Sequence, residues 1–493
     1  MAMQDGEFMR ASDAFSWYQE ADPALRSTVV AVAWLDRCPD WNELCATMEV
    51  ATRLVPRFRQ RVEEPPARVA PPRWTLDEDF DLSWHLRRVD APEPHTPEVV
   101  LDLARIEAMT GFDPGRPLWK FTLVERVGQN RAALVMKMHH SLADGQGAMK
   151  LAPLLFDQTP TGRPRPLPPA PIADHGGLAV ASLVHDARMA GDLIADGVRS
   201  LPALGLRFLR DPVRAVRETI DTVRSIATTV RPVARTLSPV MRGRGQGRGF
   251  EVVVVDLADL KRAATTADAT VNDAFLTAVT GGLRRYHQLH DARPATLRVT
   301  MPISIRTAAD AAASNRITLM RFPLPVSEAD PAARILLIGK SCREARAQRS
   351  LGFTDAIAGG LDLLPTGIVG SLLKRVDFLA SDVIGMPEAV YLAGARMTAY
   401  CAFGPTMGCA ANLTLMSYAG TCFVGVTLDT VAIPDAEVFA TCLRDGFTEV
   451  LDLASPHGAA RLPVREGTYP GAGHTTRNAR RKPSVARAAG QGS

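Results

Sequence analysis

The chain has 493 residues, of which 46% are hydrophobic and 22% charged, and its net charge is +4 at pH 7. This composition is typical of a globular protein, and it excludes a wholly disordered chain, a collagen-like chain and a disulfide scaffold. At about 150 residues per domain we expect two or three domains, and the near-neutral charge gives no indication of nucleic-acid binding.

The cysteines and the apolar segments indicate where the protein resides. No two of the seven cysteines have C-x-x-C spacing, so we expect reduced thiols rather than a zinc site or a disulfide framework. The N-terminal sequence lacks the apolar segment of a signal peptide, and no stretch reaches the roughly 20 apolar residues that a membrane-spanning helix needs. We therefore expect a cytoplasmic protein that can touch a membrane surface without crossing it.

Residues 1–156 are predicted to form one mixed α/β domain. Residues 27–35 are rich in β-branched and apolar side chains and predict a strand, and residues 41–54 predict a helix. A second apolar segment at residues 131–138 predicts a buried strand, and residues 146–156 predict the helix that follows it. The loop between these last two elements carries the most distinctive residues of the chain.

Residues 157–249 are predicted to link two domains. The segment begins with a proline-rich stretch, and residues 176–240 carry apolar side chains three and four positions apart, which predicts helices. Residues 243–249, with the sequence GRGQGRG, are predicted to form a flexible basic loop.

Residues 250–460 are predicted to form a second mixed domain, and the basic residues 461–493 a disordered tail. Residues 251–256 predict a strand, and residues 257–267 and 272–287 predict helices. Further strands are predicted over residues 297–305, 317–324, 389–392, 411–417 and 421–428, and a closing helix over residues 436–452. Two strand-rich halves with flanking helices predict a pseudo-duplicated, two-domain α/β sandwich.

The loop after residues 131–138 carries the string HHSLADG, residues 139–145. Adjacent residues of an extended chain point to opposite sides, so one histidine can face a cleft while the other packs into the domain. A histidine suits general-base catalysis because its unperturbed pKa lies near neutral pH. Gly145 permits a tight turn before the helix. A bare histidine pair is more often packed in a core, with Asp144 as a helix cap, but the complete string between a strand and a helix favours a catalytic role. No nearby cysteine or third histidine suits a metal.

HHSLADG matches the HHxxxDG motif of the CoA-dependent acyltransferase superfamily, which includes chloramphenicol acetyltransferase, carnitine acyltransferases and condensation domains. Further segments resemble the bacterial wax ester synthase/diacylglycerol acyltransferase family, in that family's order. They are Pro117-Leu118-Trp119, Thr270-Val271-Asn272-Asp273-Ala274, RFRQR at residues 57–61, FDL at residues 80–82, YLAGAR at residues 391–396 and SYAG at residues 417–420. The resemblance runs from about residue 10 to residue 455. It implies an α/β (α+β) fold of two chloramphenicol-acetyltransferase-like sandwich domains, pseudo-duplicated and joined by a helical linker.

The resemblance also implies an O-acyltransferase that moves a long-chain acyl group from acyl-CoA, a co-substrate, to diacylglycerol or a fatty alcohol. It implies no cofactor, no metal and no covalent acyl-enzyme. His140 would be the general base, His139 would support it, and Asp144 would hold the loop through a charge-assisted contact. Because the acyl chain and the acceptor are apolar, we also expect contact with a membrane or lipid-droplet surface.

Two groups of residues are candidates for substrate contacts. Asn272 and its neighbour Asp273 open a predicted helix, where an amide can donate to the oxyanion of the tetrahedral intermediate. The alternative is that Asn272 is the N-cap of a helix that begins at Asp273. Pro117, Leu118 and Trp119 form the second group, although core packing is the favoured role for Trp119.

Some features leave alternatives open. Eleven arginines between Arg199 and Arg248 can bind anionic lipid, form a solvated face of packed helices or contact the phosphates of CoA. This chain has SDVIGM at residues 381–386 where the family usually has SNVPGP, and NRIT at residues 315–318 where the family often has Asn-x-x-Gly. These differences leave open the substrate preference, an acyltransferase for another hydroxyl or amine acceptor, and a catalytically silent lipid-binding homologue.

Overall fold

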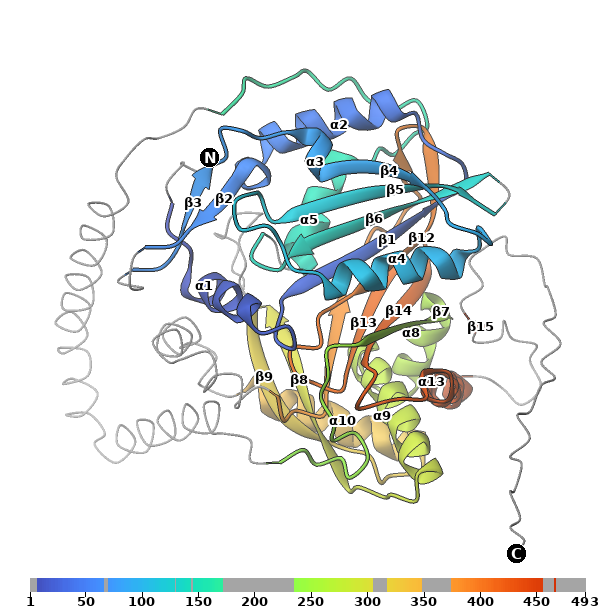
Figure 1. Cartoon of the computed structure of the whole chain (residues 1–493). Helices are drawn as coiled ribbons and strands as arrows, with labels where there is room; N and C mark the ends of the chain where they lie inside the picture. Colours follow the sequence, from blue (N-terminus) through green and yellow to red (C-terminus); the bar gives the residue numbers. More distant parts are fainter. Residues whose placement is uncertain are drawn as a thin grey trace, which may run out of the picture.

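The computed structural model describes residues 7–65, 70–128, 130–142, 145–171, 235–304, 317–347, 374–454 and 465–466. These residues form two β-sheets, one above the other in Figure 1, each with helices packed against it. A two-stranded ribbon of β2 (Gln60–Glu63) and β3 (Arg73–Leu76) stands beside the upper sheet. The predicted fold of two mixed α/β halves is confirmed.

The N-terminal sheet has six strands in the order β11-β12-β1-β6-β5-β4. These strands are β1 (Thr28–Leu35), β4 (Leu86–Asp90), β5 (Trp119–Val127), β6 (Arg131–His139), β11 (Tyr391–Leu392) and β12 (Ala395–Phe403). Helix α4 (Pro97–Met109) packs against one face, and α5 (Gly145–Leu155) lies behind the other, next to α2 (Trp41–Leu54) (Figure 1). Strand β6 pairs with β1 and β5 and is covered on both faces, which explains its nearly continuous apolar sequence.

The C-terminal sheet has seven strands in the order β15-β7-β14-β13-β10-β8-β9. They are β7 (Arg248–Asp256), β8 (Thr296–Ser304), β9 (Ile317–Pro325), β10 (Phe378–Val383), β13 (Ala411–Tyr418), β14 (Thr421–Asp429) and β15 (Arg465–Glu466). One face carries the helices α8 (Leu257–Thr266), α9 (Val271–Leu289), α10 (Pro331–Arg346) and α13 (Ala436–Leu451). The opposite face meets the N-terminal lobe, because Val252, Met416 and Phe423 belong to the hydrophobic core of that lobe.

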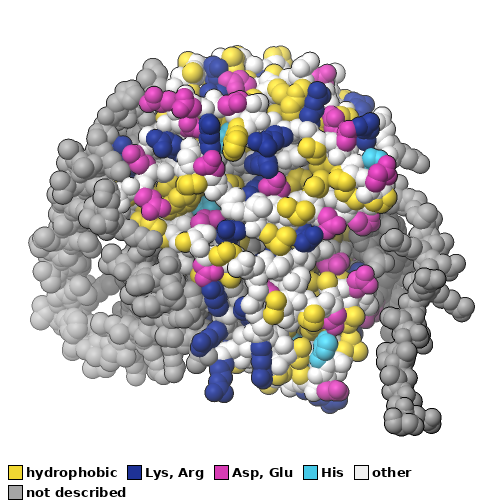
Figure 2. All heavy atoms as spheres, viewed as in Figure 1, with side chains coloured by type: hydrophobic (Ala, Val, Ile, Leu, Met, Phe, Trp, Pro, Cys, Tyr) yellow, Lys and Arg dark blue, Asp and Glu magenta, His cyan; other side chains and the backbone are white. Residues whose placement is uncertain are grey.

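Short elements complete the described chain. Helix α1 (Ala11–Tyr18) and the 3-10 turn η1 (Gln19–Ala21) lie at the junction of the two lobes (Figure 1). The others are η2 (Pro56–Arg59), α3 (Leu82–His85) and η5 (Asp452–Ala454). Within the described residues, no helix has the length and apolar character needed to cross a bilayer. Acidic and basic side chains are interspersed over the described part of the face in Figure 2.

A strand pair joins the lobes across the predicted boundary at residue 250. Strands β11 and β12 come from the C-terminal half of the chain, yet β12 pairs antiparallel with β1 of the N-terminal sheet. Phe403 at the end of β12 stacks on Phe250 of β7, with ring centroids 4.1 Å apart. Strand β14 passes so close to β12 that a side chain at Gly425 would collide with the carbonyl of Ala402. The two lobes therefore share a core as well as a chain.

Polar segments were harder to predict than apolar ones. The predicted basic loop at residues 243–249 ends earlier than expected, because Arg248 already belongs to β7, and Arg244 within it donates to the carbonyls of Gly408 and Val376 at 2.6 and 2.9 Å. Arg244 satisfies carbonyl groups far along the chain, whereas Arg248 donates to the nearby carbonyls of Gly245 and Gly247. In the predicted disordered tail, residues 465–466 pair with β7. The predicted linker helices largely fall on residues 172–234, outside the described residues.

Candidate active site

The two histidines of HHSLADG lie where β6 ends, and they have different environments. His139 is the last residue of the strand and is fully buried, whereas His140 begins the following turn and keeps partial exposure. The backbone N–H of His139 donates to the carbonyl of Leu118, and that of His140 donates to the carbonyl of Ser27, both at 3.0 Å. The structure thus places one histidine of the pair in the interior and leaves the other partly exposed.

His139 is enclosed by aromatic rings and is hydrogen-bonded through its Nδ1 atom, whereas its Nε2 atom has an ion-pair contact with Glu20 but no hydrogen bond of good geometry within the described residues. Trp17 and Phe112 approach it edge-on, with ring centroids 6.1 and 5.9 Å away. Its Nδ1 atom lies 2.6 Å from the Oγ atom of Ser141 and accepts the backbone N–H of Ser141 at 3.2 Å. Its Nε2 atom faces the carboxylate of Glu20 at 3.3 Å. A histidine held in this way can orient its neighbour but has no access to a substrate.

Charged side chains lie between α4 and the sheet near His139; Lys137 is buried, and Arg26 and Glu107 are partly exposed. Arg26 donates to the carbonyl of Met109 at 2.7 Å, and Lys137 donates to that of Gly111 at 3.1 Å. Both cations therefore stabilise the C-terminal end of α4, where the helix dipole is negative. Burial lowers the pKa of Lys137, and the carboxylate of Glu107, 3.5 Å from its Nζ atom, opposes that shift.

The segment Pro117-Leu118-Trp119 is buried and lies at the start of β5. Its contact with the histidine pair is made by the backbone, because the carbonyl of Leu118 accepts the N–H of His139. The described contacts thus give this segment a role in positioning β6.

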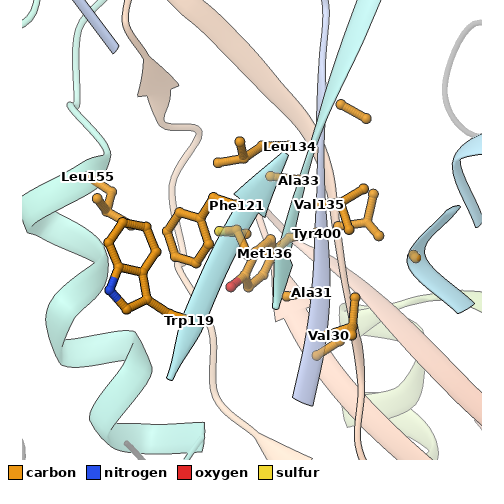
Figure 3. Close-up of a cluster of buried hydrophobic side chains, with 14 of the residues drawn as sticks. Val30, Ala31, Ala33, Trp119, Phe121, Leu134, Val135, Met136, Leu155 and Tyr400 are labelled. Carbon is orange, nitrogen blue, oxygen red and sulfur yellow. The ribbon is translucent and has the colours of Figure 1, made fainter. Parts of the chain in front are cut away.

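Trp119 is a core residue, which agrees with the role favoured from the sequence. Its side chain is 1% exposed, its Nε1–H donates to the carbonyl of Phe58 at 2.8 Å, and its ring stacks on His85 with centroids 4.7 Å apart. Figure 3 shows the indole beside Phe121, with Leu155 of α5 close to it. The conjugated ring fills the space between the sheet and α5.

Helix α5 begins at Gly145, the last residue of the motif. Asp144, predicted to hold this loop, lies outside the described residues, and its role stays a prediction.

The N-cap of α9 is Thr270, so the prediction that Asn272 caps a helix beginning at Asp273 is wrong. The Oγ1 atom of Thr270 accepts the N–H of Asp273 at 3.1 Å, and the carboxylate of Asp273 accepts the N–H of Thr270 at 3.0 Å. This reciprocal capping box engages Asp273, which was predicted to contact substrate, in the helix start itself.

Asn272 takes no part in this capping box. Its side chain is 8% exposed, and neither its amide oxygen nor its amide nitrogen has a hydrogen-bond partner within the described residues. Burying an amide without a partner is costly, so such a group is a candidate for binding a ligand.

The departure from the family pattern at residues 381–386 lies at the end of β10. Asp382 stands in the strand beside β13, and burial raises its pKa to about 6, although Arg346 opposes the shift. Ile384 is 74% exposed just after the strand. Where the family usually has an amide, this chain therefore holds a carboxyl group in an unfavourable environment.

The sequence analysis did not identify three charged residues near His139, namely Glu20, Arg26 and Lys137. Lys137 interrupts an apolar strand, and a lysine at such a position signals a buried charge that needs partners. Glu20 and Arg26 lie in a segment without periodicity, and only the fold brings them to His139.

Comparison with family models and relatives places this site in context. The catalytic-domain model of wax ester synthase/diacylglycerol acyltransferase matches residues 9–275, and the model of its C-terminal domain matches residues 313–450. A putative diacylglycerol O-acyltransferase of Mycobacterium tuberculosis is 35% identical over 93% of this chain and 94% of its own length. A probable diacylglycerol O-acyltransferase of the same species is 25% identical over 93% of this chain and 96% of its own length.

Solved structures share the architecture. The wax ester synthase/diacylglycerol acyltransferase from Marinobacter aquaeolei VT8 aligns with a TM-score of 0.60 and 19% identity, over 91% of this chain and 100% of that one. The first condensation domain of the calcium-dependent antibiotic synthetase aligns with a TM-score of 0.59 and 15% identity, over 94% and 99%. Both likenesses show a common two-lobed, pseudo-duplicated fold. The two family models and the 35% identity over 93% of the chain establish that the chain belongs to the wax ester synthase/diacylglycerol acyltransferase family.

Proposed function

We propose that this protein transfers a long-chain acyl group from acyl-CoA to the hydroxyl of diacylglycerol or of a fatty alcohol, with His140 as the general base. Family membership over most of the chain supports the reaction class. The observation that carries the site is the contrast at the end of β6, where His139 is buried and engaged while His140 is partly exposed.

In this mechanism His140 removes the proton of the acceptor hydroxyl while the oxygen attacks the thioester carbonyl. The intermediate carries its negative charge on the former carbonyl oxygen. When it collapses, the carbon–sulfur bond breaks, and the leaving CoA sulfur takes the proton back from His140. The products are an ester and CoA, and no acyl-enzyme forms. Asn272 is the proposed donor to the oxyanion, because its buried amide has no partner within the described residues.

The test offers purified protein palmitoyl-CoA with either dioleoylglycerol or hexadecanol and follows both CoA thiol release and the lipid product. His140→Ala should lower acceptor-dependent release by about 10²- to 10⁴-fold, the usual contribution of a general base. The matched control is His290→Ala, because His290 lies at the far end of α9 and pairs with Asp435 at 3.1 Å.

Two results would contradict the proposal. Release that persists in His140→Ala would mean that another group is the base. No release with either acceptor, from folded protein that still binds palmitoyl-CoA, would favour another acceptor or a silent lipid-binding homologue.

We further propose that the protein meets its lipid substrates at a membrane or droplet surface. Trp84 on α3 is 42% exposed, and the guanidinium groups of Arg87 and Arg116 lie 5.1 and 5.4 Å from its ring. An exposed tryptophan between arginines suits an anionic lipid interface. Trp84→Ala should reduce sedimentation with phosphatidylglycerol vesicles several-fold, whereas Leu289→Ala, which removes an exposed leucine of the other lobe, should not. Equal binding of wild type and Trp84→Ala would exclude this surface.

A further inference from the structure

Glu20 makes three contacts next to the histidine pair. It lies in the turn η1 and its side chain is 13% exposed. Its Oε1 atom accepts the backbone N–H of Ser27 at 2.8 Å and lies 3.3 Å from the Nε2 atom of His139. Its Oε2 atom lies 3.9 Å from the Nε atom of Arg26.

The carboxylate of Glu20 is ionised near neutral pH. Burial alone would raise its pKa, but the contacts with His139, Ser27 and Arg26 outweigh burial, and the pKa is lowered. Near neutral pH the group is therefore a charged acceptor that carries no proton of its own.

Both groups that Oε1 contacts are backbone neighbours of His140. The carbonyl of Ser27 accepts the N–H of His140, and His139 precedes His140 in the chain. A single carboxylate oxygen thus connects the residue before β1 to the last residue of β6. The backbone of His140 is attached to both points, by its hydrogen bond to Ser27 and by its peptide bond to His139.

The hydrogen bonds around His139 also determine which ring nitrogen carries its proton. The backbone N–H of Ser141 can only donate, and it donates to Nδ1, so Nδ1 must accept. A neutral His139 therefore carries its proton on Nε2, which is the atom that faces Glu20. The hydroxyl of Ser141 then donates to Nδ1 as well.

We infer that Glu20 is a positioning residue for the base: its carboxylate holds His139 in the Nε2–H form and ties it to Ser27, and so fixes the backbone that presents His140. This role rests on the proposed function of His140. It differs from that function because Glu20 acts only through His139 and Ser27 and touches no substrate.

The order Glu20–His139–Ser141 resembles an acid–histidine–nucleophile set, but the burial argues against that chemistry. Ser141 is 2% exposed and its hydroxyl is directed at a histidine that is itself fully buried. A nucleophile needs access to the thioester carbon, and a serine in this position has none. A covalent acyl group on Ser141, detected by mass spectrometry after incubation with palmitoyl-CoA, would overturn the inference.

The first measurement is independent of activity. In protein labelled with ¹⁵N-histidine, long-range ¹H–¹⁵N spectra distinguish the two neutral forms of each of the ten histidines. The His139 signals are the set that both Ser141→Ala and Glu20→Gln move. They should show a protonated Nε2 in the wild type. A protonated Nδ1 would refute the inference, whatever the enzyme's substrate proves to be.

The second measurement separates positioning from substrate binding. Glu20→Ala should lower kcat on the order of 10- to 100-fold, because a displaced catalytic group costs about that much, and should leave the KM for palmitoyl-CoA within about twofold. Glu20→Gln keeps an acceptor oxygen for Ser27 and His139 and should retain kcat within about threefold. The matched control is Glu49→Gln, because Glu49 also contacts two groups, Arg53 and Arg59, each at 2.7 Å.

The outcomes are distinguishable. If Glu20→Ala does not fold, Glu20→Gln and the spectra still decide the question. A loss of kcat in Glu20→Gln as large as that in Glu20→Ala would show that the negative charge is needed and that an acceptor oxygen alone does not position His139, which would contradict the inference. An unchanged kcat in both variants would show that Glu20 is dispensable and would contradict it as well. A wild type without any acyl transfer would end the proposed function but leave the assignment of the His139 proton to the spectra.

Discussion

Replacing Asn272 by leucine tests whether its amide contributes to catalysis or to the stability of the fold. Leucine has nearly the shape of asparagine, so the change removes the amide with little change in packing. No hydrogen bond with a described residue is lost, because both amide atoms lack partners there. An unsatisfied buried polar group costs about 1–3 kcal/mol, so Asn272→Leu should be as stable as the wild type or more stable by up to about 3 kcal/mol.

Asn412 is the matched control in the same lobe. It is 2% exposed, its Nδ2–H donates to the carbonyl of Pro405 at 2.7 Å, and its Oδ1 atom accepts the hydroxyl of Thr414 at 3.1 Å. Asn412→Leu breaks both bonds and should cost about 2–4 kcal/mol, since it leaves partner groups unsatisfied.

The assay combines urea unfolding with steady-state kinetics on palmitoyl-CoA and the active acceptor. If Asn272 stabilises the oxyanion, Asn272→Leu should lose about 10²- to 10³-fold in kcat while remaining at least as stable as the wild type. Destabilisation comparable to that of Asn412→Leu would refute the claim that the Asn272 amide has no structural partner. Full activity in stable Asn272→Leu would refute its role toward the oxyanion.

Two further substitutions follow from buried groups. Asp382→Asn should stabilise the protein near pH 8 by at most about 3 kcal/mol, because burial raises the Asp382 pKa from 3.8 to about 6. Because of the raised pKa, Asp382 in the folded state takes up a proton as the pH falls through about 6. The stability advantage of Asp382→Asn should therefore shrink below that pH and vanish near pH 4. Thermal unfolding of both proteins from pH 4 to 8 measures the difference, and a pH-independent difference would contradict the prediction. Trp119→Ala should cost about 3–5 kcal/mol in chemical unfolding, because the ring is 1% exposed, and a stable but inactive Trp119→Ala would instead favour a substrate contact.

Local patterns predicted the elements that carry chemistry, and long-range contacts determined what those elements do. The alternation of a strand was sufficient to predict that His139 and His140 face different environments. The capping residue was misplaced by two positions, although the spacing of Thr270 and Asp273 is that of a capping box. Nothing near Glu20 in the sequence predicts its contact with His139, since the two lie more than a hundred positions apart and the fold alone brings them together.

The fixed position of the Arg244 segment and the strand β12 were both missed from the sequence, for the same physical reason. A glycine- and arginine-rich sequence is flexible in isolation, and it becomes ordered here because its partners, Gly408 and Val376, lie more than a hundred residues away in the chain. Strand β12 lies beside β1 through a pairing between opposite halves of the sequence. Hydrogen bonds of this range leave no trace in local composition.

The location of the candidate residues suggests why the lobes share a strand. Ser27 accepts the backbone N–H of His140, Leu118 accepts that of His139, and Glu20 contacts both Ser27 and His139, so all these contacts lie in the N-terminal lobe. Asn272, the proposed oxyanion donor, begins a helix of the C-terminal lobe. A base in one lobe and a donor in the other can act on one carbonyl group only if the lobes keep a fixed relation, because catalysis is sensitive to shifts of about 1 Å. The pairing of β12 with β1 and the close passage of β14 at Gly425 supply that rigidity, so the shared core is as much a requirement of the proposed reaction as the histidine itself.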